Sequence, residues 1–503
     1  MHAAARWCLA RPRRAISLAV LASVSLHLLF LSRELGPDEG GFLLVASQWD
    51  PATDGSWLYG DLWVDRPPVI LLVFRLAHEW GPYGVRLVAC VAAAAFVLTA
   101  AWAGRVAGGQ RAGTWGALIT AALGASALIG AHWLNGELLA GPLVLGACAL
   151  TMTNQRASDR ALAGPGGGRV RRRCARRSRA LGQAERRRRS GVRPRAAGGI
   201  RPCPRTAGAP GCRPPDRVPA RVHGTAGAGR RLAYSFASLQ DLWFAMYGFR
   251  TEATGVIAYG SWDSSAERLL LLLALALVSG VAYLAAGTVA AQWRALRHRQ
   301  RRPLALAIGA TFAVEVVTML LGGSYWPHYL VGMLPMLALG GGLAAAGPTR
   351  RHLRQRRLIV LAAATRLVAT PAVVVAMHET RDPERLAGRW LALSAHTDDT
   401  ALVTYTGPNL LQASGLDTPY PYLWSLPVRT VDPHLKRMRA LVRGPEAPTW
   451  IVEWDGFGSW GLDPHGQMSG LVAQRYRTVA VVCGEPVWLR RGVVRTLADV
   501  PDC

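Results

Sequence analysis

The sequence predicts a mainly α-helical protein, a polytopic transmembrane helix bundle followed by a C-terminal α/β domain. Of the 503 residues, 51% are hydrophobic and only 18% are charged. Apolar stretches close to the roughly 20 residues that a membrane-spanning helix needs recur along the chain. After residue 378 they give way to short apolar segments that alternate with helical patterns, which is typical of an α/β layer.

Candidate membrane spans divide between the two halves of the chain. The first follows a basic N-terminus that holds Arg11, Arg13 and Arg14. We interpret it as an uncleaved anchor rather than a signal peptide, because no small-x-small cleavage site follows at the right distance. The candidate spans are 15–31, 85–107, 112–132, 138–153, 267–291, 303–321, 328–347 and 358–377.

The distribution of arginine predicts which loops face the cytoplasm, because short basic loops favour that side. The N-terminal arginines place the chain start inside, so the loop 32–84 falls outside. Arginine-rich loops at 294–302 and 350–357 also fall inside. They place 233–266 and the C-terminal domain, 379–503, on the extracytoplasmic side.

One stretch, 154–231, carries most of the charge. It holds 22 Arg against three acidic residues, a surplus of 19 out of the net charge of +27. The basicity is therefore local, and the chain as a whole does not have the composition of a nucleic-acid binder. No part of this stretch is apolar enough to span a bilayer, yet the topology requires an odd number of crossings between residues 154 and 233.

Two interpretations of 154–231 stay open. Its Arg, Pro and Gly content is typical of a disordered cytoplasmic loop. The interpretation that we favour is out-of-frame translation, since CGN arginine codons read one base later encode Ala, Gly, Val or Asp. The corrected frame would be apolar and would restore the missing span. The expected regions are 1–153 and 232–378 in the membrane, with 154–231 between them and 379–503 beyond.

The C-terminal region predicts strands at Thr400–Tyr405, Thr449–Glu453 and Arg477–Val482, with helices at Leu386–Leu393 and Pro433–Val442. Cys483 and Cys503 lie in this region and could form a disulfide if it is extracytoplasmic. We find neither a phosphate-binding glycine loop nor a nucleophile motif in it.

The first outer loop holds an acidic pair, Asp38–Glu39, just beyond the first span. Carboxylates beside an apolar boundary are partly desolvated, which raises their basicity. A base of this kind can take the proton of an acceptor hydroxyl as a new bond forms. The alternative is that both carboxylates only keep the loop solvated.

A second motif in the same loop, Asp65-Arg66-Pro67-Pro68, precedes an apolar run too short to span a membrane. We expect a helix in the membrane interface with proline at its first turn. Arg66 could bind a phosphate through two hydrogen bonds, or it could contact lipid headgroups. Arg86, at the start of the next span, lies on the same side and is a weaker candidate.

Polar residues at the outer ends of later spans could face the same cavity. Glu137 follows the third span, and His328 and Tyr329 begin another within Trp326–Tyr329. Glu137 is either a second acidic site residue or a loop charge. The aromatic and histidine cluster is either an interfacial belt or a group that holds a diphosphate or a sugar.

Together these residues resemble the GT-C superfamily of membrane glycosyltransferases that use polyprenyl-phosphate sugars. It includes the protein mannosyltransferases of glycosyltransferase family 39 and the bacterial aminoarabinose transferases. The similarity covers about residues 10–153 and, more loosely, 233–377, and the chain departs from the pattern at 154–231. The shared features are an acidic pair, an Asp-Lys/Arg-Pro-Pro motif, an Arg-Leu span start and a later acidic residue, here Asp38–Glu39, Asp65–Pro68, Arg86-Leu87 and Glu137.

The resemblance implies an enzyme of the bacterial plasma membrane that moves a sugar by a single inverting displacement. The donor would be a polyprenyl-phosphate sugar and the acceptor an extracytoplasmic lipid, glycan or protein. No cofactor or catalytic metal is implied. Asp38 would be the general base and Arg66 would bind the donor phosphate. The expected catalytic residues are Asp38, Glu39 and Glu137, and the expected substrate-binding residues are Asp65, Arg66, Arg86, His328 and Tyr329.

Two other functions remain open. A lipid or sugar transporter would also place polar groups at the outer face. It would explain Glu315 near the middle of a predicted span, where a charge is expensive, although Glu315 could instead be protonated or pair with Arg366. The second alternative is an inactive product of the frameshift.

Overall fold

The computed structural model describes residues 11–48, 59, 62–163, 239–260, 262–347, 350–379 and 382–503. The chain forms two compact units, one of Met1–Ala149 with Ala228–Cys503 and one of Leu150–Gly227. The described residues are mainly helical, with a small sheet near the C-terminus, as predicted. The expected frameshift and its missing span concern 154–231, and beyond residue 163 that segment lies outside the described residues.

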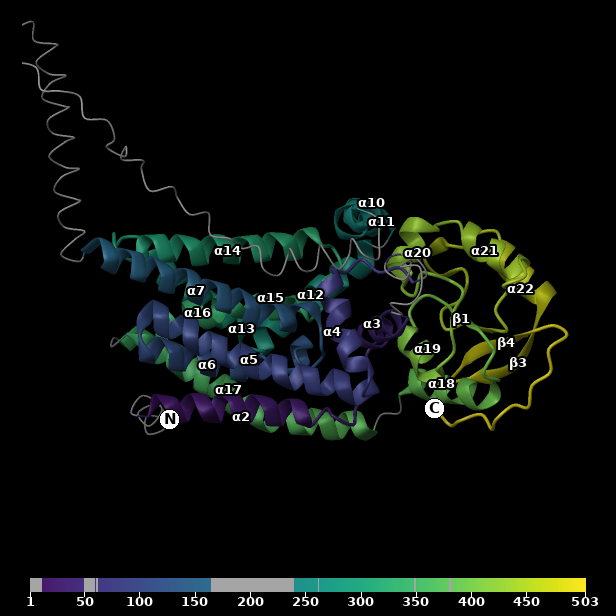
Figure 1. Cartoon of the computed structure of the whole chain (residues 1–503), viewed down its shortest axis with the longest axis horizontal. Helices are drawn as coiled ribbons and strands as arrows, with labels where there is room; N and C mark the ends of the chain where they lie inside the picture. Colours follow the sequence, from purple (N-terminus) through teal and green to yellow (C-terminus); the bar gives the residue numbers. More distant parts are fainter. Residues whose placement is uncertain are drawn as a thin grey trace, which may run out of the picture. The chain divides into compact units, whose positions relative to one another are not determined.

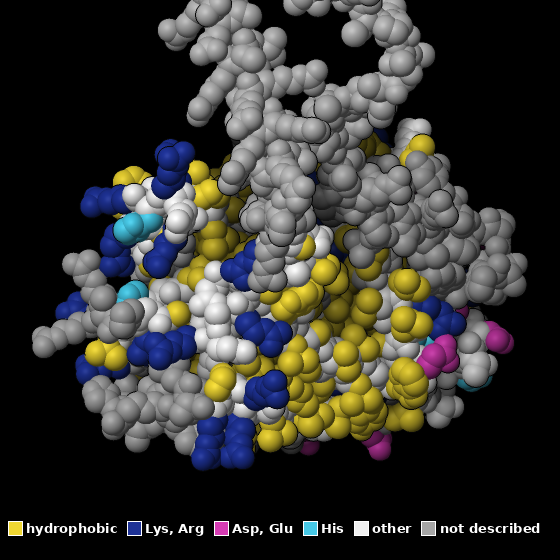
Figure 2. All heavy atoms as spheres, turned by 60° about the vertical axis from the view of Figure 1, so that its left-hand side comes forward, with side chains coloured by type: hydrophobic (Ala, Val, Ile, Leu, Met, Phe, Trp, Pro, Cys, Tyr) yellow, Lys and Arg dark blue, Asp and Glu magenta, His cyan; other side chains and the backbone are white. Residues whose placement is uncertain are grey.

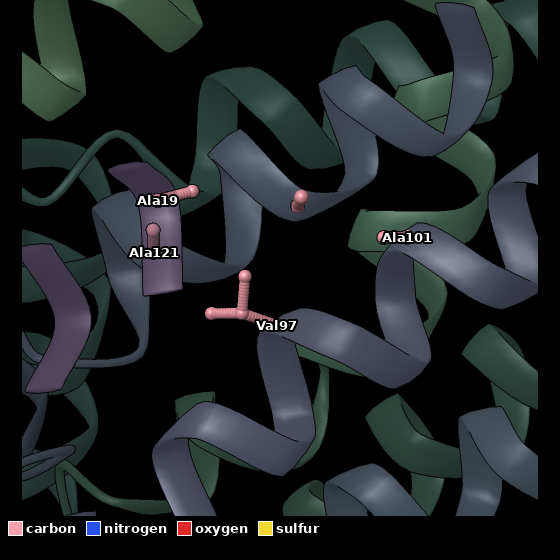
Figure 3. Packing of buried hydrophobic residues seen from close by; sticks show 5 residues of the cluster. Ala19, Val97, Ala101 and Ala121 are labelled. Atoms are coloured by element: carbon pink, nitrogen blue, oxygen red, sulfur yellow. The ribbon is translucent and has the colours of Figure 1, made fainter. Parts of the chain in front are cut away.

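The core of the bundle is built from α2 (Pro12–Leu28), α5 (Gly81–Gly108), α6 (Gln110–Leu123) and α16 (Leu334–Ala346), which pack against one another (Figure 1). Small residues fill one of these interfaces: Ala19, Val97, Ala101, Ala117 and Ala121 form a buried cluster (Figure 3). Small side chains let helix backbones approach closely, which is how helices associate in membranes.

Among the residues that the structure describes, four helices are long and apolar enough to cross a membrane. They are Gly81–Gly108 of α5, Gly136–Ser158 of α7 (Gly136–Ala163), α14 (Arg302–Leu321) and His352–Ala376 of α17 (Arg350–Glu379). The most apolar part of α14 has a mean hydropathy of 2.2, yet only 11% of it is buried. Figure 2 shows hydrophobic side chains spread over a broad part of one face. An apolar exterior of this kind indicates a membrane protein.

Several predicted spans differ from the observed helices. The span 267–291 is broken into α12 (Trp262–Val278) and α13 (Val281–Ala295), which are bent by 74°. The break falls at Gly280, whose φ of 82° is a left-handed conformation that glycine adopts readily. The pair counts as one further span if it crosses the membrane together.

Two more predicted spans are also shorter than expected. The helix α6 has only 14 residues, and the span 328–347 is divided into α15 (Tyr329–Gly332) and α16 of 13 residues. Pro335 lies in the first turn of α16, where its missing N–H needs no partner. The remaining helices before the C-terminal domain are α10 (Leu239–Trp243), the π-helix η2 (Phe244–Gly248), α11 (Phe249–Gly260) and the 3-10 turn η1 (Ala127–Ile129).

The segment 32–84 contains two short helices, α3 (Pro37–Ser47) and α4 (Pro68–His78). The helix expected after Pro67 and Pro68 is α4, which begins at Pro68. In α3, Pro37 also occupies the first turn, and the backbone N–H of Gly36 donates to the side chain of Glu39 at 3.1 Å. Proline and this cap fix where α3 begins.

The C-terminal domain has a four-stranded sheet in the order β1-β2-β4-β3, with β1 (Ala401–Val403) parallel to β2 (Trp450–Val452) and the other neighbours antiparallel. The three predicted strands are confirmed, while β4 (Glu485–Arg490) was not predicted; it follows β3 (Tyr476–Val482) after a tight turn at Cys483-Gly484. Cys483 and Cys503 form a disulfide. The helices are α18 (Pro383–Ser394), α19 (Pro408–Ser414), α20 (Ser425–Val431), α21 (Lys436–Arg443), α22 (Gln467–Arg475) and the 3-10 turn η3 (Ser459–Gly461).

The segment 32–84 packs directly against the C-terminal domain. Helix α3 lies on α19, and a methyl group added at Gly40 would come within 2.6 Å of the Asn409 Cα. The Trp63 N–H donates to the Pro421 carbonyl at 3.0 Å. Glycine is therefore needed at Gly40 because two backbones meet there.

We expect Gly40→Ala to destabilise the protein by about 1–3 kcal/mol, because the new methyl group meets backbone atoms that cannot rotate away. The midpoint of thermal unfolding in detergent measures this effect. Gly255→Ala is the matched control, since Gly255 is also helical and has nothing within 4 Å of an added methyl group. Because alanine favours helix, that variant should be neutral or stabilising. Equal effects of the two substitutions would contradict the close contact.

Asp399 anchors the sheet of the C-terminal domain to the chain end. It is buried and accepts hydrogen bonds from Arg495 Nη2 at 2.6 Å, Arg495 Nε at 2.9 Å and Trp450 Nε1 at 2.9 Å. Burial opposes the charged form of Asp399, but these hydrogen bonds outweigh it and lower the pKa of Asp399 to about 2.

A carboxyl pKa lowered on folding predicts a pH-dependent stability. The contribution of Asp399 is full above its ordinary pKa of 3.8 and is lost as the pH falls toward about 2. The shift corresponds to about 2 kcal/mol. We expect Arg495→Gln to remove much of this contribution at neutral pH and to flatten the dependence between pH 4 and pH 2, roughly. Unfolding midpoints of both proteins across that range test it, and parallel curves would contradict it.

Candidate functional site

The adjacent carboxylates of the acidic pair lie in different environments. Glu39 is 2% exposed, whereas Asp38 is partly exposed at the first turn of α3. In the part of the chain that the structure describes, no hydrogen bond or ion pair engages the Asp38 carboxylate. Asp38 is thus the carboxylate of the pair that remains available to a ligand.

Glu39 and Arg86 form a buried ion pair. Arg86 Nη1 lies 2.7 Å from Glu39 Oε1, and both side chains are 2% exposed. The same Glu39 oxygen accepts the Leu134 N–H at 2.7 Å, and Arg86 also donates to the Glu34 carbonyl at 2.5 Å. The expected catalytic role of Glu39 and the expected substrate binding by Arg86 stay predictions. Their polar atoms are used within the protein, so both position the site.

The Arg66 side chain is partly exposed and contacts an acidic and an aromatic residue. Its Nη1 is 2.7 Å from Asp65 Oδ1, and its guanidinium carbon lies 5.5 Å from the centre of the Phe42 ring. The other oxygen of Asp65 pairs with Arg250 of α11. The Arg66 and Arg250 side chains are 28% and 45% exposed, against 12% for Asp65. Two guanidinium groups thus flank one carboxylate and keep exposed surface.

Residues from four parts of the chain raise the pKa of Arg66. Burial alone would lower the pKa of Arg66, but Asp65, and then Asp38, Glu137 and Tyr329, attract the charge and raise the pKa above its ordinary value. Arg66 is therefore always cationic. Residues that the sequence singled out separately are close enough to act on one guanidinium.

Glu137 and Glu315 lie on either side of Gly332. A methyl group added at Gly332 would be 3.8 Å from Glu137 Cγ and 3.4 Å from Glu315 Oε2. The expected alternative of a Glu315–Arg366 pair is wrong for the described residues, whose ion pairs do not include it. Glu315 instead contributes a carboxylate near Glu137.

His328 lies beside Tyr329 and Gly130. Its ring lies 5.0 Å from that of Tyr329 in an edge-on arrangement, and its Cβ would be 3.4 Å from a methyl group added at Gly130. Tyr329 acts on Arg66, and His328 packs against Tyr329. His328 therefore packs beside Tyr329, and its binding of substrate stays a prediction.

Sequence reasoning missed Arg250. It lies in Phe249-Arg250-Thr251-Glu252 at the start of α11, after the arginine-rich stretch, and belongs to no motif. The available signal was an isolated basic residue in a segment expected on the same side as Asp65. Arg250 and Asp65 are 185 positions apart in the sequence, so no local pattern predicts that they form a pair.

We call the group Asp38, Asp65, Arg66, Glu137, Arg250 and Tyr329 the arginine cluster. It combines fixed positive charge with an unpaired carboxylate, which suits a phosphate-bearing ligand and proton transfer. No group of three His, Cys, Asp or Glu residues in the described ranges could hold a metal ion. Comparisons with protein-family models, curated proteins and solved structures find no match to the chain.

We expect Arg86→Met to destabilise the protein by about 3–5 kcal/mol, because it leaves the buried Glu39 charge without its partner. Adding Glu39→Gln should recover part of the loss, since the amide oxygen can still accept the Leu134 N–H while the charge is gone. Thermal unfolding in detergent compares the two proteins. The control is Arg75→Met, which breaks an exposed pair with Glu79 and should change little. A double variant less stable than Arg86→Met would contradict this.

Proposed function

We propose that the protein is a membrane glycosyltransferase that transfers a sugar from a polyprenyl-phosphate donor to an extracytoplasmic acceptor. The observation that supports it most directly is the Asp65 carboxylate paired with both Arg66 and Arg250, two guanidinium groups that keep exposed surface. The resemblance to the GT-C superfamily rests on several of the same residues. The helices long enough to span a membrane agree with a lipid-linked donor.

Arg66 and Arg250 are suited to bind the donor phosphate. Both pair with Asp65 and keep exposed surface, so a phosphate could replace part of the contact with that carboxylate. Arginine forms paired hydrogen bonds with phosphate oxygens. In the reaction, the bond between the anomeric carbon and the phosphate oxygen breaks, and polyprenyl phosphate leaves with the bonding electrons. The two guanidinium groups stabilise its negative charge.

Asp38 is suited to be the general base. Its carboxylate is partly exposed and lies near Arg66. As the acceptor oxygen bonds to the anomeric carbon from the opposite face, Asp38 takes the hydroxyl proton, and the configuration inverts. Glu137 adds a second negative charge near Arg66 and helps to fix its position.

The disulfide and the loop contacts support the expected sidedness. Disulfides persist mainly in oxidising compartments, so the Cys483–Cys503 bond favours an extracytoplasmic C-terminal domain. The arginine-rich loops point the same way, and the plasma membrane of a bacterium is the proposed location. Because α3 packs on α19, the arginine cluster would share that side.

We expect Asp38→Asn to lower the rate of transfer about 10²–10⁴-fold while donor binding is retained, because the amide cannot take the proton. Release of polyprenyl phosphate from a panel of polyprenyl-phosphate hexoses and pentoses measures the rate. Arg66→Ala and Arg250→Ala should instead weaken donor binding.

The matched control is Asp398→Asn, an exposed aspartate of the C-terminal domain, which should transfer sugar at the original rate. Sugar transfer by Asp38→Asn at the original rate would contradict the role of Asp38 as the general base. Movement of the lipid-linked sugar across vesicles without transfer would instead identify a transporter.

A further inference from the structure

A polar cavity lies beside the start of α3. No residue of the arginine cluster lines it. It has a volume of about 140 Å3 and is lined by residues of the bundle and of the C-terminal domain, among them Gly36, Pro37, His132, Trp133, Glu384 and Asn409. A cavity of about 150 Å3 accommodates one benzene ring. The volume is therefore of the order of a single ring.

Two buried side chains in its lining lack partners. His132 is 5% exposed and Asn409 is 8% exposed. Neither ring nitrogen of His132 nor the amide oxygen of Asn409 has a hydrogen-bond partner among the described residues. Buried polar atoms normally find partners, and leaving them unpaired costs free energy. These three atoms are therefore candidates to bind a ligand.

The chemistry of these atoms favours hydroxyl groups. Burial, and then the nearby positive charge of Arg86, lower the pKa of His132 to about 3, so the imidazole is neutral, with one donor and one acceptor nitrogen. Asn409 offers an acceptor oxygen. A hydroxyl group both donates and accepts a hydrogen bond, so it can satisfy either nitrogen as well as the amide.

Five charged residues line the cavity, namely Arg33, Glu34, Arg86, Asp382 and Glu384. Two of them form ion pairs within the protein. Arg86 is paired with Glu39, and Glu34 is paired with Arg385 at 2.9 Å. Burial, with Asp382 adding to it, raises the pKa of Glu384, which favours its neutral form. Trp133 supplies an aromatic wall, with its indole 3.6 Å from a methyl group added at Gly36.

We propose that this cavity binds one neutral sugar ring, with His132 and Asn409 holding its hydroxyl groups and Trp133 lying against the ring. Sites of this kind combine an aromatic surface with a few placed polar groups. Pro37 lines the cavity and precedes Asp38. The role of the ring as the acceptor sugar rests on the proposed function, whereas sugar binding itself does not.

Saturation-transfer NMR on the full chain in detergent tests the proposal, with the methyl glycosides of glucose, mannose and galactose as probes. We expect at least one glycoside to bind, and His132→Phe and Asn409→Leu each to weaken its binding at least tenfold. Glu384→Gln, at a partly exposed position, is a third variant that should fold and should weaken binding less. The matched controls are the exposed His298→Phe, Asn154→Leu and Glu446→Gln, which should bind as before.

Every outcome of this experiment bears on the proposal. Binding that survives the three substitutions, or that equally fails in the controls, overturns it. Absence of binding by all three glycosides also overturns it and leaves water as the occupant. If the unaltered protein binds the glycoside through this cavity but transfers no sugar from any polyprenyl-phosphate donor, the proposed function fails while the sugar site stands.

Discussion

The buried pair of Glu39 and Arg86 is the interaction on which the arrangement of the site depends. A carboxylate and a guanidinium that are each 2% exposed need full hydrogen bonding, and the Leu134 N–H and the Glu34 carbonyl complete it. These bonds connect α3, α5 and the segment before α7, and they fix the rotation of α3 about its axis. Neighbouring helical residues point about 100° apart, given 3.6 residues per turn. With Glu39 held inward, Asp38 is turned to a different side and stays accessible.

Three consecutive residues of α3 thus have three different roles. Asp38 offers a partly exposed carboxylate, Glu39 enters the buried pair, and Gly40 allows the backbone of α19 to approach. The C-terminal domain is therefore held against the same short helix that presents Asp38. This coupling explains how a domain without a nucleophile motif of its own can still shape the site. It places Asn409 beside Gly40 and into the wall of the cavity beside Pro37.

Local patterns predicted the local features well. Pro67 and Pro68 predicted the start of α4, and short apolar segments predicted three of the four strands. Features set by distant contacts could not be predicted from the same patterns. Neither the partner of Glu39 nor that of Arg250 is near in the sequence, and hydropathy alone did not reveal the bend at Gly280. An acidic pair predicts carboxylates at a boundary, but which of the two becomes buried is decided by Arg86.

The different environments of Asp38 and Glu39 also bear on how two substrates could be kept apart. A transfer reaction needs a charged leaving group and an uncharged acceptor close together, and the two need opposite surroundings. The arginine cluster supplies fixed cationic groups near Asp38. In the lining of the cavity beside Pro37, by contrast, Arg86 and Glu34 are in ion pairs, and the side chains of His132 and Asn409 are neutral. A phosphate would bind poorly in the cavity beside Pro37. A neutral ring would gain little from the guanidinium groups of the arginine cluster. The buried pair lies at the boundary between them, since Arg86 lines the cavity while its partner Glu39 adjoins Asp38. One ion pair can thus keep apart two sites of different chemistry on a single short helix.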